Sequence, residues 1–124
     1  MRASIMAARI GDFSRQLDGT ASIDFRFASS DPVFAGHFPK QPLVPGIFQP
    51  EMARMGAEWL LGEPFAVREI TKAKFLRPIV PTEVMRMNLK ASVNGDAIVV
   101  RATFSVGGQT AGETVLKLVK AHGL

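Results

Sequence analysis

Apolar and polar residues alternate along much of the chain, which predicts a sheet of several strands. In residues 21–28, Ile23, Phe25 and Phe27 fall on one face, as expected of a half-buried strand. Four later segments have similar patterns and continue almost to the end of the chain: 65–77, 83–93, 96–106 and 109–120. Asn94-Gly95 and Gly107-Gly108 separate the last three segments, and such pairs suit tight hairpin turns. The second half of the chain therefore predicts an antiparallel meander.

Between residues 46 and 61 the apolar spacing changes to that of a helix. At about 100° per residue, Phe48, Met52, Met55 and Trp59 lie within an arc of about 60° and form one apolar stripe. Pro50 is tolerated in the first turn of a helix, which places the start near 45–47, and Gly62 is a typical C-terminal stop. One helix that covers one face of a sheet predicts an α+β fold.

The composition indicates one ordinary globular domain, residues 1–124, with 47% hydrophobic and 21% charged residues. The absence of Cys excludes disulfides, thiolate nucleophiles and Cys-based zinc sites. Residues 1–10 are too short and too interrupted for a signal peptide or a membrane span, so we expect a cytoplasmic protein. The net charge of +4 suits an acidic partner or simply a basic soluble domain. The scattered basic residues and the absence of Tyr argue against nucleic acid.

His37 is the first candidate for chemistry, because it lies in a loop that is rich in proline. The loop runs to Gly46 and contains Pro32, Pro39, Pro42 and Pro45, which restrict its backbone. An imidazole has an ordinary pKa of ~6.5 and suits proton transfer near neutral pH. Taken alone, His37 would more often be a surface or hydrogen-bonded loop residue.

Glu51 is the second candidate, 14 residues after His37 and about 40° outside Met55 on the helical wheel. Burial at the margin of the apolar stripe would favour its neutral form, while the first helical turn favours the anion. On the helix alone, a surface carboxylate that interacts with the helix dipole or pairs with Arg54 is the more frequent arrangement.

The combination of the two candidates is more specific than either. Gly36-His37-Phe38-Pro39-x-x-Pro42-x-x-Pro45-Gly46, followed by Glu51, resembles the signature of the 3-hydroxyacyl-acyl-carrier-protein dehydratases, the FabZ-like type with a single hot-dog domain. Residues 72–81 are similar to that family's Lys-x-x-Phe-Arg-Arg-Pro-Val-x-Pro-Gly-Asp block. The resemblance covers residues 23–119.

The resemblance implies a curled antiparallel sheet wrapped around one long central helix, and two subunits paired edge to edge. His37 of one subunit would then face Glu51 of the other in a homodimer. Neutral His37 would remove an α-hydrogen of the thioester, and Glu51 would protonate the departing β-hydroxyl. The backbone N–H of Gly46, at the helix N-terminus, would stabilise the enolate oxygen. This elimination needs no metal and no cofactor.

The resemblance also implies a tunnel and a carrier. Phe38, Phe48 and Met52 are candidates to line an apolar acyl tunnel. Acyl carrier protein, or coenzyme A in its place, would meet Lys72, Lys74 or Arg77, although strand lysines equally often keep a sheet edge solvated. Assembly into a trimer of dimers or with a second kind of subunit stays open.

Departures from the family pattern indicate a divergent relative, for a dedicated lipid, polyene or polyketide pathway. They leave His37 and Glu51 in place and concern Lys40, Gln49-Pro50, residues 52–55, Leu76 and Thr82-Glu83. Two alternatives remain: a hot-dog thioesterase that uses a carboxylate-activated water, and a non-catalytic acyl-binding or heteromeric subunit.

Overall fold

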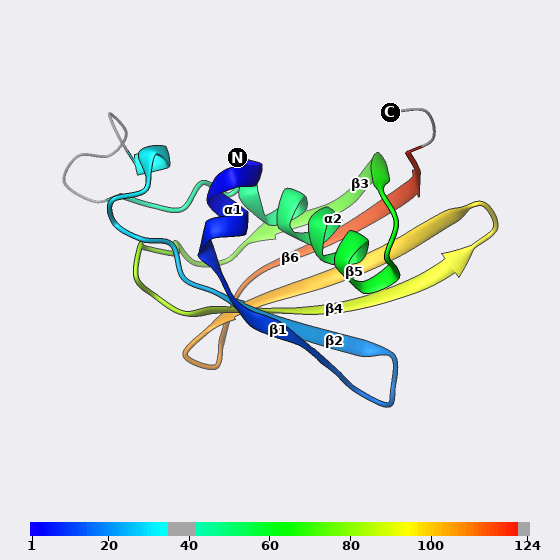
Figure 1. Cartoon of the computed structure of the whole chain (residues 1–124), viewed down its shortest axis with the longest axis horizontal. Coiled ribbons are helices and arrows are strands. Elements are labelled where there is room, and N and C mark those ends of the chain that lie inside the picture. Colours follow the sequence, from blue (N-terminus) through cyan, green and yellow to red (C-terminus); the bar gives the residue numbers. More distant parts are fainter. Residues whose placement is uncertain (35–41, 122–124) are drawn as a thin grey trace.

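The computed structural model describes residues 1–34 and 42–121 of the chain. In these residues, two α-helices, a short 3₁₀ helix and six strands follow one another, arranged as Figure 1 shows. In chain order these are α1 (Arg2–Ala8), β1 (Arg9–Arg15), β2 (Thr20–Phe25), a 3₁₀ turn (Pro32–Phe34), α2 (Phe48–Leu61), β3 (Phe65–Phe75), β4 (Met85–Asn94), β5 (Ala97–Val106) and β6 (Gln109–Lys120).

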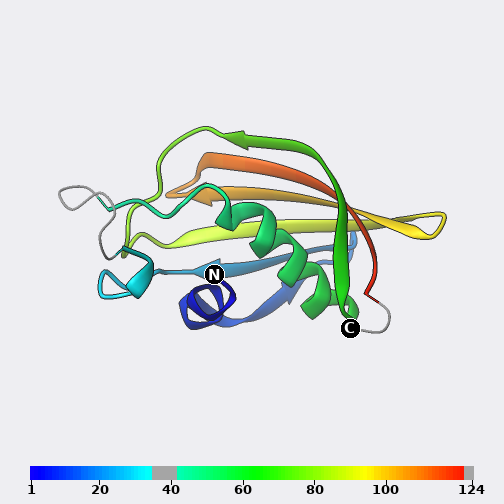
Figure 2. The same ribbon diagram turned by 90° about the horizontal axis from the view of Figure 1, so that it is seen from above.

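The six strands form one antiparallel sheet in the order β1-β2-β4-β5-β6-β3. The sheet curves, and α2 lies diagonally across its inner face (Figures 1 and 2). β1 and β3 are the two edge strands. This arrangement confirms the predicted α+β class with a curled sheet around one long helix.

The helix α2 buries the apolar stripe that its sequence predicts. Phe48, Met52 and Met55 are buried, and Trp59 packs against the same core. Pro50 falls in the first turn, where its missing N–H costs no intrahelical bond. Gly62 ends the helix with φ 76°, and its N–H donates to the Glu58 carbonyl. Both predicted helix boundaries are therefore confirmed.

The two predicted hairpin turns are present. Asn94 pairs with Ala97 and Val106 pairs with Gln109, so each turn has two residues between its strands. Gly107 and Gly108 both have positive φ angles, 57° and 81°, which glycine adopts without strain.

On β4 the alternation is confirmed for Met85, Met87 and Leu89, which are buried. Val93, predicted on the same face, is 80% exposed.

The N-terminal elements α1 and β1 have no counterpart in the sequence prediction. Ile5 of α1 is fully buried, while most residues of β1 are exposed. An edge strand that buries few side chains has little hydrophobic alternation, so its sequence looks unstructured. The Arg9 guanidinium lies 4.5 Å from the Trp59 ring centroid. This cation–π contact links the start of β1 to α2.

The core lies between α2 and the inner face of the sheet. Most of its largest side chains come from four strands and α2: Phe25, Met52, Met55, Met85, Met87, Leu89, Phe104, Leu116 and Leu118. Ile5 of α1 and Phe27, just after β2, also belong to this set. None of the helices in the described part of the chain is long and apolar enough to cross a membrane.

Thr82 is the one described non-glycine residue with a positive φ, 74°. It stands where the related pattern has the Gly of Gly-Asp, and its N–H donates to the Phe27 carbonyl at 2.8 Å. A β-branched side chain in the left-handed region costs about 1–2 kcal/mol. We expect Thr82→Gly, which keeps the N–H, to raise the free energy of unfolding by about 1 kcal/mol.

Chemical denaturation of the purified chain measures this difference. Thr82→Ala is the control, because alanine keeps a Cβ and should recover little of the stability. A Thr82→Gly protein less stable than the wild type would show that the threonine is favourable there.

Candidate active site

The candidate site is built around the segment that leads into α2. The Val44 N–H donates to the Ile79 carbonyl at 2.8 Å, which ties this segment to the chain just after β3. The carbonyls of Pro45 and Gly46 accept from Phe48 and Gln49, both at 3.0 Å, and so start the helix. Among the described residues, no backbone carbonyl accepts from the Gly46 N–H. That N–H lies at a helix N-terminus, where negative charge is stabilised.

A pocket of about 360 Å³ opens beside Gly46. Phe75 forms part of its wall, and a Cβ on residue 46 would lie 3.2 Å from the Phe75 ring, so glycine allows close packing. The described lining is mostly apolar and consists of Leu43, Val44, Gly46, Gln49, Phe75, Leu76, Arg77, Pro78 and Ile79. The fold thus brings two predicted site residues, Gly46 and Arg77, to one pocket.

Gln49 and Arg77 are the polar side chains in this mostly apolar lining. Gln49 is only 4% exposed, and its Oε1 has no hydrogen-bond partner among the described residues. Sequence reasoning noted Gln49 as a departure from the family pattern but did not place it at the site. The signal was available, because a glutamine where aliphatic residues are usual indicates a polar group at a buried position of the helix.

Glu51 lies in the first turn of α2, and the described contacts pair it with Arg54. The Arg54 Nε donates to one carboxylate oxygen of Glu51 at 3.0 Å, and Nη2 donates to the other. The ion pair of Glu51 with Arg54, expected from the sequence as the alternative to a catalytic role of Glu51, is therefore present. About 200° of rotation separates Glu51 from Gln49 on the helix, and Glu51 is not among the described residues that line the pocket.

Arg54 continues this network along α2. Its Nη1 donates to Glu58 at 2.8 Å and to the Phe65 carbonyl at 3.2 Å, at the start of β3. Glu58 in turn accepts from the Phe65 N–H at 2.8 Å. The hydrogen bonds from Arg54 to Glu51, and then the charges of Glu51 and Glu58, raise the pKa of Arg54 above its ordinary value. Arg54 therefore stays charged.

Phe48 and Met52, predicted to line the acyl tunnel, are part of the buried core, 4% and 0% exposed. Neither is among the described residues of the pocket beside Gly46. Their role in a tunnel stays a prediction. His37 and Phe38 lie outside the described residues, as does the rest of segment 35–41.

The three predicted carrier-binding residues lie on β3 and just beyond it. Lys72 donates to Glu113 on β6 at 2.9 Å, and this hydrogen bond lowers the pKa of the Glu113 carboxyl. Lys74 is exposed. Arg77 donates to Glu83 at 2.9 Å beside the pocket. Lys74 is therefore the most accessible of the three, whereas Lys72 and Arg77 have carboxylate partners.

Glu83 holds the turn between β3 and β4, and its pairing has a pH consequence. The Val80 N–H first, and Arg77 second, lower the pKa of Glu83 below 4.5. A carboxyl with a lower pKa in the folded state stabilises the fold fully above its unfolded pKa, and the effect is lost as the pH falls through the folded pKa. We expect Glu83→Gln to make the free energy of unfolding less dependent on pH below about 4.5.

Denaturant unfolding at a series of acid pH values measures this slope. Glu63→Gln is the matched control, because Glu63 has an exposed ion pair with Lys120, at 3.7 Å. An unchanged slope in Glu83→Gln would contradict the prediction.

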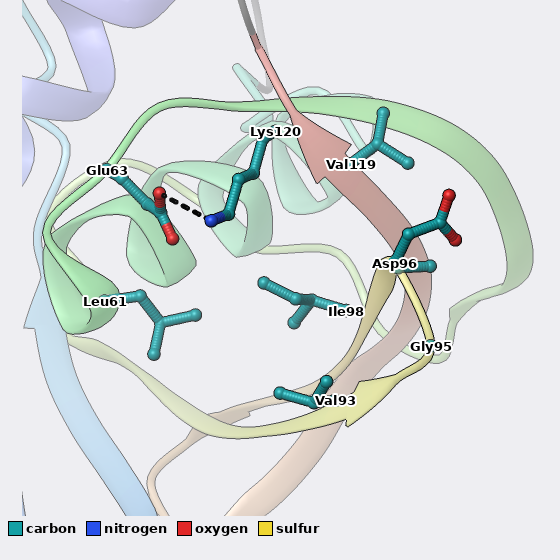
Figure 3. Close-up of a pocket in the computed structure, with 9 residues that line it drawn as sticks. Leu61, Glu63, Val93, Gly95, Asp96, Ile98, Val119 and Lys120 are labelled. Atoms are coloured by element: carbon teal, nitrogen blue, oxygen red, sulfur yellow. Dashed lines mark ion pairs between the residues drawn. The ribbon is translucent and has the colours of Figure 1, made fainter.

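A larger pocket, of about 600 Å³, lies at the opposite end of α2 (Figure 3). Leu61, Val93 and Ile98 point into it, and the ion pair of Glu63 and Lys120 lies at its rim. None of the predicted site residues that the structure describes lines it. Of the described candidate residues, Gly46 and Arg77 lie instead at the pocket beside the N-terminal end of α2.

Comparisons with known proteins identify the family of the chain. A family model described as ApeI-like, the ApeI dehydratase, matches residues 14–114. The chain belongs to this dehydratase family. A 3-hydroxyacyl-[acyl-carrier-protein] dehydratase FabZ from Clostridium botulinum (strain Kyoto / Type A2) is 32% identical over 111 residues, which cover 82% of this chain and 77% of that protein. The predictions of a dehydratase and of a divergent FabZ-like member are confirmed.

Solved structures agree as well. The dehydratase heterocomplex ApeI:P from Xenorhabdus doucetiae matches with a TM-score of 0.75 and 25% identity, over 90% of this chain and 96% of that chain. A hypothetical thioesterase from Streptococcus pneumoniae TIGR4, solved with coenzyme A, matches with a TM-score of 0.69 at 10% identity, over 89% and 87%. The second likeness concerns the fold alone. The predicted hot-dog fold is confirmed.

Proposed function

We propose that this member of the dehydratase family converts 3-hydroxyacyl thioesters, carried on acyl carrier protein, to trans-2-enoyl thioesters. The observation that carries the proposal is the family match over residues 14–114, together with His37 and Glu51 at the family's spacing. The apolar pocket beside the Gly46 N–H supports it, because an acyl thioester needs an apolar site with a donor for its carbonyl oxygen.

The proposed reaction is a β-elimination. Neutral His37 takes a proton from the α-carbon, and the electron pair forms the α,β double bond as the C–O bond breaks. Protonated Glu51 gives its proton to the β-oxygen, which leaves as water. The Gly46 N–H stabilises the negative charge that develops on the thioester oxygen. This elimination needs no oxidant, reductant or metal.

We propose that each site combines residues of two subunits. Gln49 shares the pocket with Gly46, whereas Glu51 is turned about 200° away on the same helix. Such a separation suits a site that takes the Gly46 pocket and His37 from one subunit and Glu51 from the other.

The surface of β3 supports a homodimer formed through this edge strand. Val67, Ile70 and Phe75 are 39%, 48% and 55% exposed on it. An open edge strand with apolar side chains is a usual site of strand pairing. Light scattering on the purified chain measures the assembly, and a strict monomer that is active would contradict the dimer.

A heteromer is the second candidate assembly, because the similar ApeI:P structure is described as a heterocomplex. In that case the purified chain alone would be inactive, and addition of the second subunit would restore turnover.

We also infer that Lys74 and Arg77 meet the acidic carrier and that the protein works in the cytoplasm.

One incubation tests the proposed function against its alternatives. A 3-hydroxyacyl thioester of acyl carrier protein is mixed with the purified protein, and near-ultraviolet absorbance and free thiol are followed together. We expect an enoyl thioester without released thiol. Released thiol would identify a thioesterase, and neither product, with a second subunit also added, would identify a non-catalytic protein. Parallel reactions with coenzyme A thioesters determine the carrier.

A further inference from the structure

The contacts of Arg54 carry an inference that rests on the proposed function. Arg54 holds both carboxylate oxygens of Glu51 through Nε and Nη2, and its side chain is only 16% exposed. Two parallel N–H···O bonds fix the plane and direction of a carboxylate, which one bond does not. Glu51 is therefore held in one orientation by Arg54.

Arg54 is itself fixed from the other side. Glu58 accepts from Nη1 at 2.8 Å and is 14% exposed, and the Phe65 carbonyl accepts from the same nitrogen at 3.2 Å. Arg2 of α1 approaches Glu58 at 3.6 Å. The guanidinium thus bridges α2 to the first residue of β3, so it cannot turn away from Glu51 without losing these bonds.

We propose that Arg54 is a positioning residue of the dehydration reaction. It directs the Glu51 carboxyl toward the β-hydroxyl of the substrate in the site shared with the second subunit. When Glu51 has given its proton to the leaving oxygen, it becomes a carboxylate, and the adjacent guanidinium stabilises that charge as it develops. Arg54 is not among the described residues that line the pocket beside Gly46, so we expect it to act on the rate of the chemical step and not on substrate binding.

The test compares Arg54→Met, Arg54→Lys and the wild type in steady-state kinetics with the acyl-carrier substrate. We expect Arg54→Met to lower kcat by about 10–100-fold and to change KM by less than about 3-fold. Arg54→Lys keeps the charge but not the two-bond geometry, and should recover part of kcat. The matched control is Arg86→Met, because Arg86 makes a similar two-bond pair with Asp24 on the sheet, at 2.9 and 3.2 Å. That control should retain wild-type kcat.

The outcomes separate this inference from the proposed function. A wild type that makes no enoyl product defeats the function itself. A wild type that turns over, with folded Arg54→Met at the same kcat, defeats only the role of Arg54, and so does a change confined to KM. Where Arg54→Met does not fold, Arg54→Lys decides: unchanged kcat rejects the role, and a kcat lowered several-fold at constant KM supports it.

Discussion

Glu51→Gln and His37→Ala are each expected to abolish dehydration while the chain remains folded. The glutamine is close in shape to Glu51 and can still accept a hydrogen bond from Arg54, but its amide N–H is not acidic enough to protonate the leaving oxygen. Loss of one acid or base typically costs at least about 100-fold in rate, and loss of a paired group more. The enoyl product in the near ultraviolet measures turnover, and circular dichroism measures folding.

A mixing experiment extends this prediction to the proposed shared site. His37→Ala and Glu51→Gln subunits, each inactive alone, are combined under conditions where subunits exchange. A hybrid dimer would contain one site with both residues intact, so partial activity should return. Verified exchange without any activity would indicate that His37 and Glu51 act within one chain, and full turnover in either single variant would reject the assignment altogether.

Elements with strong local signals were predictable from the sequence. The helix α2 follows from its apolar stripe and from Gly62, and the two hairpins follow from their glycines. These signals depend on backbone preferences and periodicity within a few residues, which the sequence shows directly. The strand β1 was not predictable, because an exposed edge strand is held by pairing with β2 and not by its own pattern.

The candidate site was only partly predictable for a related reason. The motif names residues along the chain, and Gly46 and Arg77, 31 positions apart, do meet at one pocket. The contacts that orient Glu51 come from Arg54. The helical spacing had already indicated that Arg54 could pair with Glu51. Glu58 and the Phe65 backbone hold Arg54 from the other side. The Phe65 contact depends on how β3 returns beside α2, and helical spacing alone does not show this path.

Gly112→Ala is expected to have the largest effect on stability among the substitutions considered. Gly112 lies on β6, where it pairs with Phe75 of β3 and Phe104 of β5. A Cβ at this position would overlap the Gln49 Oε1 and lie 2.9 Å from the Lys74 carbonyl oxygen. The side chain of Gln49 is buried and the carbonyl belongs to the backbone, so neither gives way easily. We expect a loss of about 1–3 kcal/mol in the free energy of unfolding.

Gly56→Ala is the matched comparison, because Gly56 is also enclosed but meets different atoms. Its Cβ would lie 2.5 Å from the Leu89 Cδ1 and 2.7 Å from the Met87 Cε, and its three nearest neighbours are all side-chain atoms, whereas Gly112 also meets a backbone carbonyl. Alanine in a helix also gains about 1 kcal/mol over glycine. The cost of Gly56→Ala should therefore be smaller than that of Gly112→Ala, as measured by denaturant unfolding.

A double-mutant cycle with Gln49→Ala locates the cause of the Gly112 effect. Truncation of Gln49 removes the side chain that the new Cβ would overlap but leaves the Lys74 carbonyl in place. The double variant should therefore lose less stability than the sum of the two single variants, with a coupling of about 0.5–3 kcal/mol. Simple additivity would mean that the backbone of β3, and not Gln49, limits the space. Gln49 also lines the pocket beside Gly46. Non-additive stabilities of the two single variants would therefore show that the missing side chain of Gly112 provides the space that the Gln49 side chain occupies beside the pocket.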